Sequence, residues 1–217
     1  MSPWSTTHQR YRRGCGIAEL EKKIKKRKKL RNHQHQLKLP TKTVGVMKLE
    51  GGEVVPLDHN GAYPLAGWEI EGALHGSTPV LSPPAPLPRK PGVYVYNTRP
   101  AGTTTPTTPG HWVAVCVPLE NDEPVEFFDS FGKPPSAYPD FSNCLNCESE
   151  VILYNPLQLQ ESGTFACGHY VIAYCAFQLV GLKTGSFLSL FNPLTPRVND
   201  TVAVSLATPM VKRVRDL

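Results

Sequence analysis

The first forty residues lack an apolar run and have few acidic side chains. They contain 12 Lys and Arg against 2 Asp and Glu, whereas residues 41–217 contain 11 Lys and Arg against 16 Asp and Glu. Without an apolar segment, the start of the chain does not resemble a secretory signal, so we expect an intracellular protein. Without acidic partners, the basic residues form a cationic arm, and the net charge of +5 conceals a mildly acidic body.

The six cysteines lack the regular spacing of a secreted disulfide framework. Cys116 and Cys175 lie in apolar runs, as core thiols do. Cys144 and Cys147 are spaced like two zinc ligands, but no second pair of ligands is near them in the sequence, so we expect no metal site. A reducing compartment leaves thiols free, and one of them can then act as a nucleophile.

No charged side chain occurs in residues 164–182. Such a stretch is long enough to span a membrane. His169, Tyr170, Tyr174 and Gln178 suit a protein core better than lipid, so we expect no membrane contact. Apolar residues fall on every side of the predicted helix, which is typical of a helix buried inside a domain.

The remaining pattern predicts one α/β domain with a mixed sheet over residues 53–217, preceded by a basic arm over residues 1–52 that is flexible or helical. Within the arm, residues 17–39 have the spacing of a basic amphipathic helix. A long polar loop at 98–110 is expected to lie beside a site. We expect strands at 44–49, 93–96, 111–118, 125–129, 151–154 and 201–206, and helices at 64–76 and 136–147.

Three polar residues stand at the ends of predicted elements, in the order His111, Asp129, Cys167. His111 opens one strand and Asp129 closes the next, so a hairpin would place imidazole and carboxylate side by side. Cys167 begins the buried helix, where the helix dipole favours the thiolate. These are the three groups of nucleophilic catalysis: the imidazole takes the thiol proton and the carboxylate orients the imidazole.

Attack on a peptide carbonyl also requires hydrogen-bond donors for the oxyanion. The backbone N–H of Cys167 is one candidate. The side-chain amide of Gln160, seven residues earlier, is a second, and Gln158 is its alternative. His169 follows Cys167 by two positions, so on a helix it points away from the thiol, and we expect a core histidine. His59 and His75 are alternative bases if His111 does not serve.

The chain contains four further motifs: YNT at 96–98, GHWVAV at 110–115, FFDSFGKPP at 127–135 and LQESGTFACGHYVIAYC at 159–175. Together these motifs resemble the adenovirus-type cysteine proteases, in the versions carried by adenovirus-like viruses and self-synthesising DNA transposons; the SUMO-processing proteases share their fold. The order His, Asp, Cys also differs from a papain arrangement. The resemblance covers roughly residues 60–195. It implies an adenain-like fold, with a mixed central sheet and a buried helix that carries the nucleophile at its N-terminus.

The resemblance assigns roles to individual residues. It implies Cys167 as the nucleophile, His111 as the base and Asp129 as the residue that orients the imidazole. It implies Gln160 in the oxyanion hole. Adenoviral enzymes often carry Glu where Asp129 stands, whereas Asp is usual in the SUMO-processing branch. Trp112 is expected to wall the site, and Gly168 to lie with it among the substrate-binding residues.

The function that follows is a cysteine endopeptidase that processes viral or transposon structural precursors at glycine-containing sites, in the virion and the host nucleus if viral. It needs no cofactor, although the resemblance allows an activating peptide or DNA. The sequence Leu49-Glu50-Gly51-Gly52 has the form of such a substrate, so we expect self-cleavage after Gly52; a plain Gly-Gly turn is the alternative. DNA contact would fall on the basic cluster Lys22, Lys23, Lys25, Lys26, Arg27, Lys28 and Lys29.

Two other functions stay open. One is an isopeptidase that removes ubiquitin-like modifiers, and the other is a non-enzymatic DNA-binding protein in which the arm matters.

Overall fold

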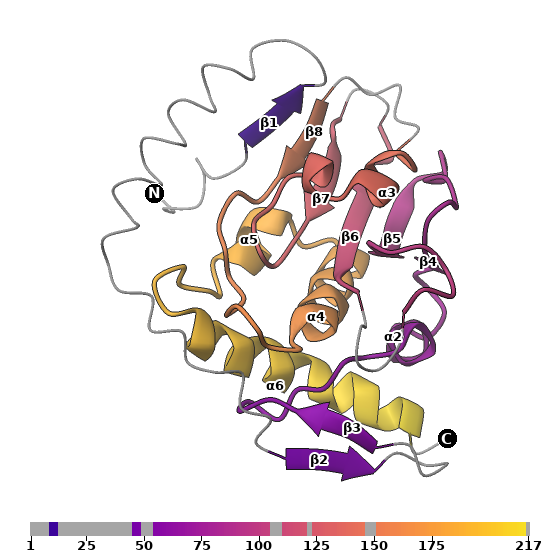
Figure 1. Cartoon of the computed structure of the whole chain (residues 1–217). Coiled ribbons are helices and arrows are strands. Elements are labelled where there is room, and N and C mark those ends of the chain that lie inside the picture. Colours follow the sequence, from indigo (N-terminus) through magenta and orange to yellow (C-terminus); the bar gives the residue numbers. More distant parts are fainter. Residues whose placement is uncertain are drawn as a thin grey trace.

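The computed structural model describes residues 9–12, 45–48, 54–104, 110–120, 123–145 and 151–215. Its centre is a six-stranded mixed sheet of order β1-β8-β7-β6-β5-β4 (Figure 1). The strands are β1 (Gln9–Arg12), β4 (Val80–Leu81), β5 (Gly92–Asn97), β6 (Trp112–Val117), β7 (Val125–Phe128) and β8 (Val151–Tyr154). A separate antiparallel pair consists of β2 (Gly45–Lys48) and β3 (Val54–Leu57). The helices are α2 (Gly67–Ala73), η1 (Pro135–Ala137), α3 (Pro139–Ser142), α4 (Cys167–Leu179), α5 (Thr184–Leu188) and α6 (Pro196–Arg215).

Strand β6 lies inside the sheet between β5 and β7 and is antiparallel to both. Its first four residues are buried because both faces of the sheet are covered. The predicted hairpin of β6 and β7 is confirmed, with Ala114 opposite Phe128 and Cys116 opposite Glu126. The start of β6 and the end of β7 therefore meet at one end of the sheet.

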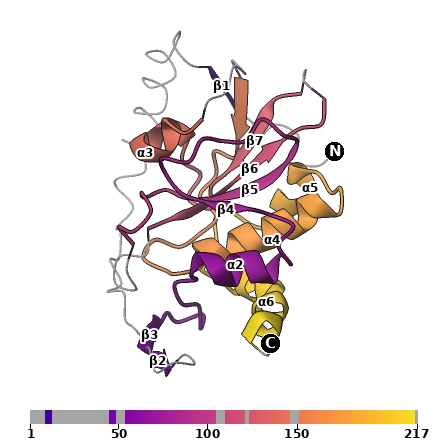
Figure 2. The ribbon, with the colours of Figure 1, turned by 90° about the vertical axis from the view of Figure 1, so that its right-hand side faces the viewer.

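Successive residues of the central strands serve two different cores. Val93 and Val95 of β5 pack with the helices α2, α4, α5 and α6, whereas Tyr94 and Tyr96 pack with Phe141 of α3. Figure 2 shows the same division, with those four helices on one face of the sheet and α3 on the other. This alternation is the two-residue period of a strand buried on both faces.

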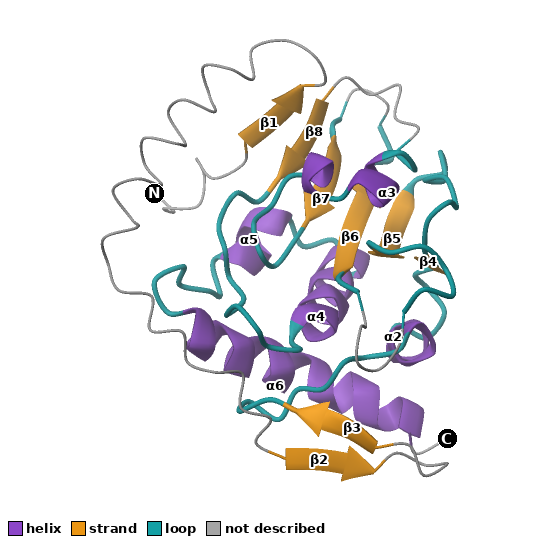
Figure 3. Cartoon of the chain, in the orientation of Figure 1, coloured by secondary structure: helices purple, strands orange, loops and turns teal. Residues whose placement is uncertain are grey.

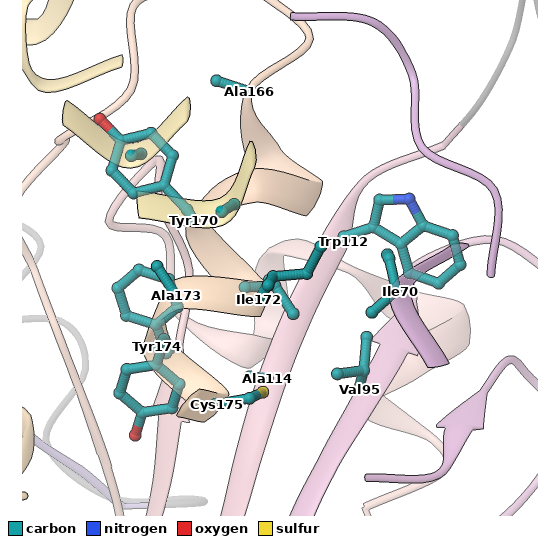
Figure 4. Close-up of a cluster of buried hydrophobic side chains, with 14 of the residues drawn as sticks. Ile70, Val95, Trp112, Ala114, Ala166, Tyr170, Ile172, Ala173, Tyr174 and Cys175 are labelled. Carbon is teal, nitrogen blue, oxygen red and sulfur yellow. The ribbon is translucent and has the colours of Figure 1, made fainter. Parts of the chain in front are cut away.

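Helix α4 is the centre of the larger core. Every residue from 168 to 175 is buried, as the absence of charge in this stretch predicted. Tyr174 stacks on Phe128 of β7 with ring centroids 4.5 Å apart, and Figure 4 shows Tyr170, Ile172 and Cys175 within the same cluster. Because α4 packs directly on the sheet, its first residue is held at a defined place relative to β6 and β7. In the described part of the chain, each helix is too short or too polar to cross a bilayer.

The strand predicted at 201–206 is wrong, because these residues lie inside α6. The run Thr-Val-Ala-Val-Ser has the alternation of an edge strand, but tertiary packing selects a helix. Asn199, Ala203, Ala207 and Val211 follow at intervals of four and are at most 5% exposed. That spacing puts them on one helix face, against α4 and α2.

Two other predictions differ in extent from the structure. The helix predicted at 136–147 is replaced by the short η1 and α3, with Pro139 beginning the second. Within the arm, the strand predicted at 44–49 is confirmed as β2, but β1 was not predicted and pairs antiparallel with β8. The predicted helix at 17–39, the basic cluster from Lys22 to Lys29 and Gly52 lie outside the described residues.

The core around α5 predicts a stability effect. Phe187 is fully buried, and its ring lies 5.0–5.5 Å from those of Phe191, Phe128, Phe177 and Tyr174. We expect Phe187→Ala to lower the free energy of unfolding by about 4 kcal/mol, because it leaves a cavity that this cluster cannot fill. Urea denaturation would measure it. Leu190→Ala is the control, since Leu190 is 44% exposed. Equal losses in both variants would contradict the assignment of this cluster as core.

Candidate active site

His111 and Asp129 meet at the end of the sheet where β6 begins and β7 ends. The Nε2 atom of His111 lies 2.6 Å from Oδ1 of Asp129. The carboxylate side chain is fully buried, and the imidazole is 12% exposed. The hairpin register accounts for this contact, because each residue directly adjoins its strand. The structure thus brings this predicted pair together.

The Asp129 carboxylate accepts hydrogen bonds from four donors. Besides His111 at Oδ1, it accepts from the backbone N–H of Phe131 and Lys133 and from the hydroxyl of Tyr138, each at 2.9 Å. Burial raises the pKa of the Asp129 carboxyl, but its hydrogen bond and charge interaction with His111 and the two backbone donors outweigh burial and lower that pKa below 3.8. Asp129 is therefore a carboxylate at neutral pH.

The imidazole of His111 is flanked by aromatic rings and by two polar partners. It stacks with Phe131 and Tyr138, at centroid distances of 4.8 and 5.6 Å. Burial lowers its pKa, but hydrogen bonds with Asp129 and Cys167, together with the charges of these groups, raise the pKa to about 9. The positively charged imidazolium is thus favoured at neutral pH.

Cys167 is the first residue of α4, at the end of the long loop that follows β8 (teal in Figure 3). Its thiol is free, the residue is partly buried, and its interaction with His111 contributes to the raised pKa of the imidazole. Nε2 of His111 is engaged by Asp129. The structure therefore brings together the three residues predicted from their positions at element ends, with a hydrogen bond between His111 and Asp129 and with Cys167 close enough to His111 to raise its pKa.

Gln160 lies in the same loop, but its amide is already engaged. The side chain is buried; its Oε1 accepts from the Ser130 hydroxyl at 2.7 Å, and its Nε2 donates to the carbonyl and hydroxyl oxygens of Thr164 at 3.0 and 3.2 Å. The alternative donor, Gln158, is exposed and donates to the Gln160 carbonyl and the Ser162 hydroxyl. In this conformation both amides stabilise the loop. The oxyanion role of Gln160 stays a prediction that requires its contact with Thr164 to open.

Trp112 and Gly168 serve the packing behind the nucleophile. The ring of Trp112 is 7% exposed, lies in the core near Ile70 (Figure 4), and donates its Nε1–H to the Leu65 carbonyl at 2.9 Å. A Cβ at Gly168 would lie 3.1 Å from Leu65 Cβ. Both residues thus hold Leu65 against the first turn of α4. In this structure β6 directs the indole into the α2–α4 core, and the expected place of Trp112 in the wall of the site stays a prediction.

The remaining histidines and cysteines have structural surroundings. His169 is buried and lies edge-on to Tyr63, which confirms a core histidine. His59 Nε2 lies 3.0 Å from Glu161 Oε2, and His75 has a positive φ just after α2. Cys144 is buried and contacts the Asp140 carbonyl, whereas Cys147 lies outside the described residues. Among the residues described, no three His, Cys, Asp or Glu side chains are grouped so that they could hold a metal.

Sequence reasoning missed the residue that joins the two halves of the site, Asn155. Its Oδ1 accepts from the Asp129 N–H at 3.0 Å, and its Nδ2 donates to the Asp129 carbonyl at 2.8 Å. Nearby, the Ser130 carbonyl accepts from the N–H groups of Leu159 and Gln160. The turn at 129–133 is thereby joined to the segment that leads to Cys167. A polar residue directly after β8 was the available signal, the same one that identified Asp129 after β7.

Comparison with known proteins identifies no family. No family model and no curated protein matches this sequence. Among solved structures, the central domain of the uncharacterized Lpg1148 protein from Legionella pneumophila is similar at 16% sequence identity and a TM-score of 0.35, with 71% of this chain and 99% of that chain covered. A likeness this weak supports no conclusion about function.

The first prediction from the site concerns the charge of His111. We expect Asp129→Asn to move the His111 titration from about pH 9 to at least about one pH unit lower, because burial then opposes the imidazolium with less compensation. NMR titration of ring-labelled histidine would measure it. The matched control is Asp140→Asn, which removes an exposed carboxylate from α3. An unchanged His111 midpoint in Asp129→Asn would show that the carboxylate does not support the charge.

The second prediction concerns the turn at Gly132. This residue has a φ of +66°, and a Cβ there would lie 2.5 Å from the backbone carbon of Leu157. We expect Gly132→Ala to lower the free energy of unfolding by about 3 kcal/mol, through backbone strain plus the clash. Gly181→Ala is the control for strain alone, since Gly181 has a similar φ of +76° with no atom within 4 Å. Its expected loss is about 1 kcal/mol, and thermal denaturation of both variants would separate the two contributions.

Proposed function

We propose that this protein is a cysteine endopeptidase of the adenovirus type, with Cys167 as nucleophile, His111 as general base and acid, and Asp129 as the residue that orients the imidazole. The observation that carries the proposal is the hydrogen bond between His111 and the buried Asp129, with Cys167 close enough to raise the pKa of the imidazole. A thiol at the first turn of a helix and an imidazole with a raised pKa are the two conditions that favour a thiolate–imidazolium pair.

The reaction follows from these positions. The Cys167 thiolate attacks the carbonyl carbon of the scissile peptide, a C–S bond forms, and the carbonyl oxygen becomes an oxyanion. The imidazolium of His111 then donates its proton to the leaving amine as the C–N bond breaks. A water molecule, deprotonated by the neutral imidazole, attacks the thioester and releases Cys167. Asp129 stabilises the imidazolium in the first half and keeps the ring in place throughout.

Stabilising the oxyanion requires donors beside Cys167. Its own backbone N–H belongs to the first turn of α4, where amides have no acceptor within the helix. The Gln160 amide becomes a second donor if substrate displaces Thr164 from its Nε2. One such donor contributes about 3 kcal/mol to stabilising the transition state.

The substrate class remains part of the proposal and rests on the motif resemblance. It consists of structural precursor proteins cut at glycine-containing sites, with activation by a peptide or DNA as a further possibility of the family. The basic arm would provide the DNA contact. Cleavage of short glycine-containing peptides favours the endopeptidase, and cleavage of a ubiquitin-like carboxyl-terminal reporter alone favours an isopeptidase.

The test is the reactivity of Cys167 toward iodoacetamide between pH 5 and 9, with the modified residue identified by mass spectrometry. We expect fast modification at pH 6 and a loss of at least about tenfold in His111→Ala, because the imidazolium no longer stabilises the thiolate. Cys116 is an internal reference, since burial and the nearby Glu126 and Glu123 raise the pKa of its thiol to about 11.

Peptide cleavage completes the test. Cys167→Ser and His111→Ala should each reduce kcat/KM by at least about 1000-fold, while Asp140→Asn on the surface should not reduce it. An unchanged alkylation rate in His111→Ala would refute the catalytic pair, whatever the peptide assay gives.

A further inference from the structure

The loop that leads to Cys167 is held from outside the site by two buried carboxylates. Asp58, just after β3, accepts the backbone N–H of Phe165 at its Oδ2, at 3.0 Å. Asp200, on α6, is 0% exposed and contacts the same loop from another side. The ion pairs found within the described residues are His59 with Glu161 and His111 with Asp129, so neither carboxylate has a Lys or Arg partner there.

Asp200 receives its hydrogen bonds from the loop and from α4. The Thr164 hydroxyl donates to Oδ2 at 2.7 Å, and the Tyr170 hydroxyl donates to Oδ1 at 3.1 Å. The backbone N–H of Glu161 lies 3.3 and 3.4 Å from the two oxygens. The preceding residue, Asn199, donates to the Leu159 carbonyl at 3.1 Å. Helix α6 thus holds the loop at three of its residues.

The contact with Thr164 connects Asp200 to the site. Thr164 precedes Cys167 by three residues, and its carbonyl and hydroxyl oxygens accept the amide hydrogens of Gln160. The Thr164 hydroxyl has two acceptors in reach, the Asp200 carboxylate at 2.7 Å and the Glu161 carbonyl at 3.0 Å, and the bond to the carboxylate is the shorter and is charge-assisted. The hydroxyl oxygen remains an acceptor for the Gln160 amide. Asp200 therefore determines how Thr164 presents itself to Gln160 and where the last turn before Cys167 lies.

We propose that Asp200 is a positioning residue for Cys167, which through Thr164 holds the loop at 160–166 in the conformation in which the thiol is reactive. This inference rests on the proposed function only where it concerns peptide cleavage. The reactivity of the thiol is a separate quantity that alkylation measures by itself.

Ionisation of Asp200 makes this positioning depend on pH. Burial raises the pKa of its carboxyl to about 7, with Asp58 adding to the rise and Thr164, Tyr170 and Glu161 opposing it. The titratable groups facing it are Asp58 after β3, Glu161 in the loop with its partner His59, and Tyr170 on α4. Burial raises the pKa of Tyr170 as well, so Tyr170 remains a donor. The ionised carboxylate accepts from these donors in charge-assisted bonds that are stronger than those to the protonated carboxyl, so the loop is held best above pH 7.

The sign for global stability is opposite. The pKa of Asp200 in the folded chain lies above its ordinary value of 3.8. Protonation of Asp200 therefore contributes fully to the free energy of unfolding below pH 3.8, and this contribution is lost as pH rises through about 7. Order in the loop therefore increases over the pH range in which overall stability decreases. This divergence separates a positioning role from a purely structural one.

The experiment compares Asp200→Asn and Thr164→Val with the full-length wild-type chain. The measured quantity is the second-order rate of Cys167 alkylation by iodoacetamide from pH 5 to 9, corrected for the folded fraction by circular dichroism. We expect the alkylation rate of the wild type to show an inflection near pH 7, in addition to any inflection from the Cys167–His111 pair. Both variants should lose this additional inflection. Their rates at pH 8 should fall about tenfold, the equivalent of one charged hydrogen bond.

The control is Thr201→Val, the same substitution at the next residue of α6. The Thr201 hydroxyl is exposed and contacts Asn60 rather than the loop, so the wild-type profile should persist. If Asp200→Asn fails to fold, Thr164→Val still decides, because it leaves the carboxylate in place and removes the Thr164 hydroxyl, which contacts Asp200, Gln160 and the Glu161 carbonyl. A Thr164→Val profile equal to that of Thr201→Val, or an inflection retained in folded Asp200→Asn, would overturn the proposal.

Peptide cleavage distinguishes the two proposals. If the wild type cuts no peptide but the alkylation profiles change as expected, the endopeptidase assignment fails and the role of Asp200 in positioning Cys167 stands. If peptides are cut and the profiles do not change, the reverse holds.

Discussion

The contact between the turn at 129–133 and the segment at 155–160 is the constraint on which the site depends. Asn155 exchanges two hydrogen bonds with the backbone of Asp129, the Ser130 carbonyl accepts two more, and Gly132 approaches the other backbone so closely that no side chain would fit. The turn carries the carboxylate, and the segment leads to the thiol. Because they are joined directly, Asp129 and the segment before Cys167 are placed by backbone hydrogen bonds as well as by side-chain contacts, which is the kind of preorganisation that the proposed catalysis requires.

Two aspartates illustrate how surroundings decide the ionisation of the same side chain. Asp129 and Asp200 are both 0% exposed, and burial alone raises the pKa of each. Asp129 faces an imidazole that can carry positive charge, and its pKa falls below the ordinary value. Asp200 faces neutral donors and the negative charge of Asp58, and its pKa rises to about 7. One carboxylate is thus charged at neutral pH beside His111, and the pKa of the other lies near neutral pH beside the loop.

Helix α4 links these two regions, since its first residue contacts His111 and its first turn includes Tyr170, a donor to Asp200. Behind the thiol, Gly168 and Trp112 hold Leu65, and α6 holds the loop from the opposite side. Gln160 is part of this support in the present conformation, because both ends of its amide are bonded within the protein. Cys167 therefore follows a loop whose supports come from α4, α6 and the residues just after β3 and β7, which are far apart in the sequence.

The amino-acid sequence by itself determined the hairpin of β6 and β7, the buried helix α4 and the meeting of His111, Asp129 and Cys167, because each depends on local patterns: strand alternation, an uncharged run, polar residues at element ends. Only the tertiary structure decided the rest. The run at 201–206 alternates like a strand, yet packing against α4 and α2 makes it helical. The places of β1, Asn155 and Asp200 depend on partners 26 to 145 positions away, and Trp112 supports Leu65 from within the core. Hydrogen bonds of this kind leave no periodic trace, because nothing in the neighbouring residues specifies a partner that only the folded chain brings near.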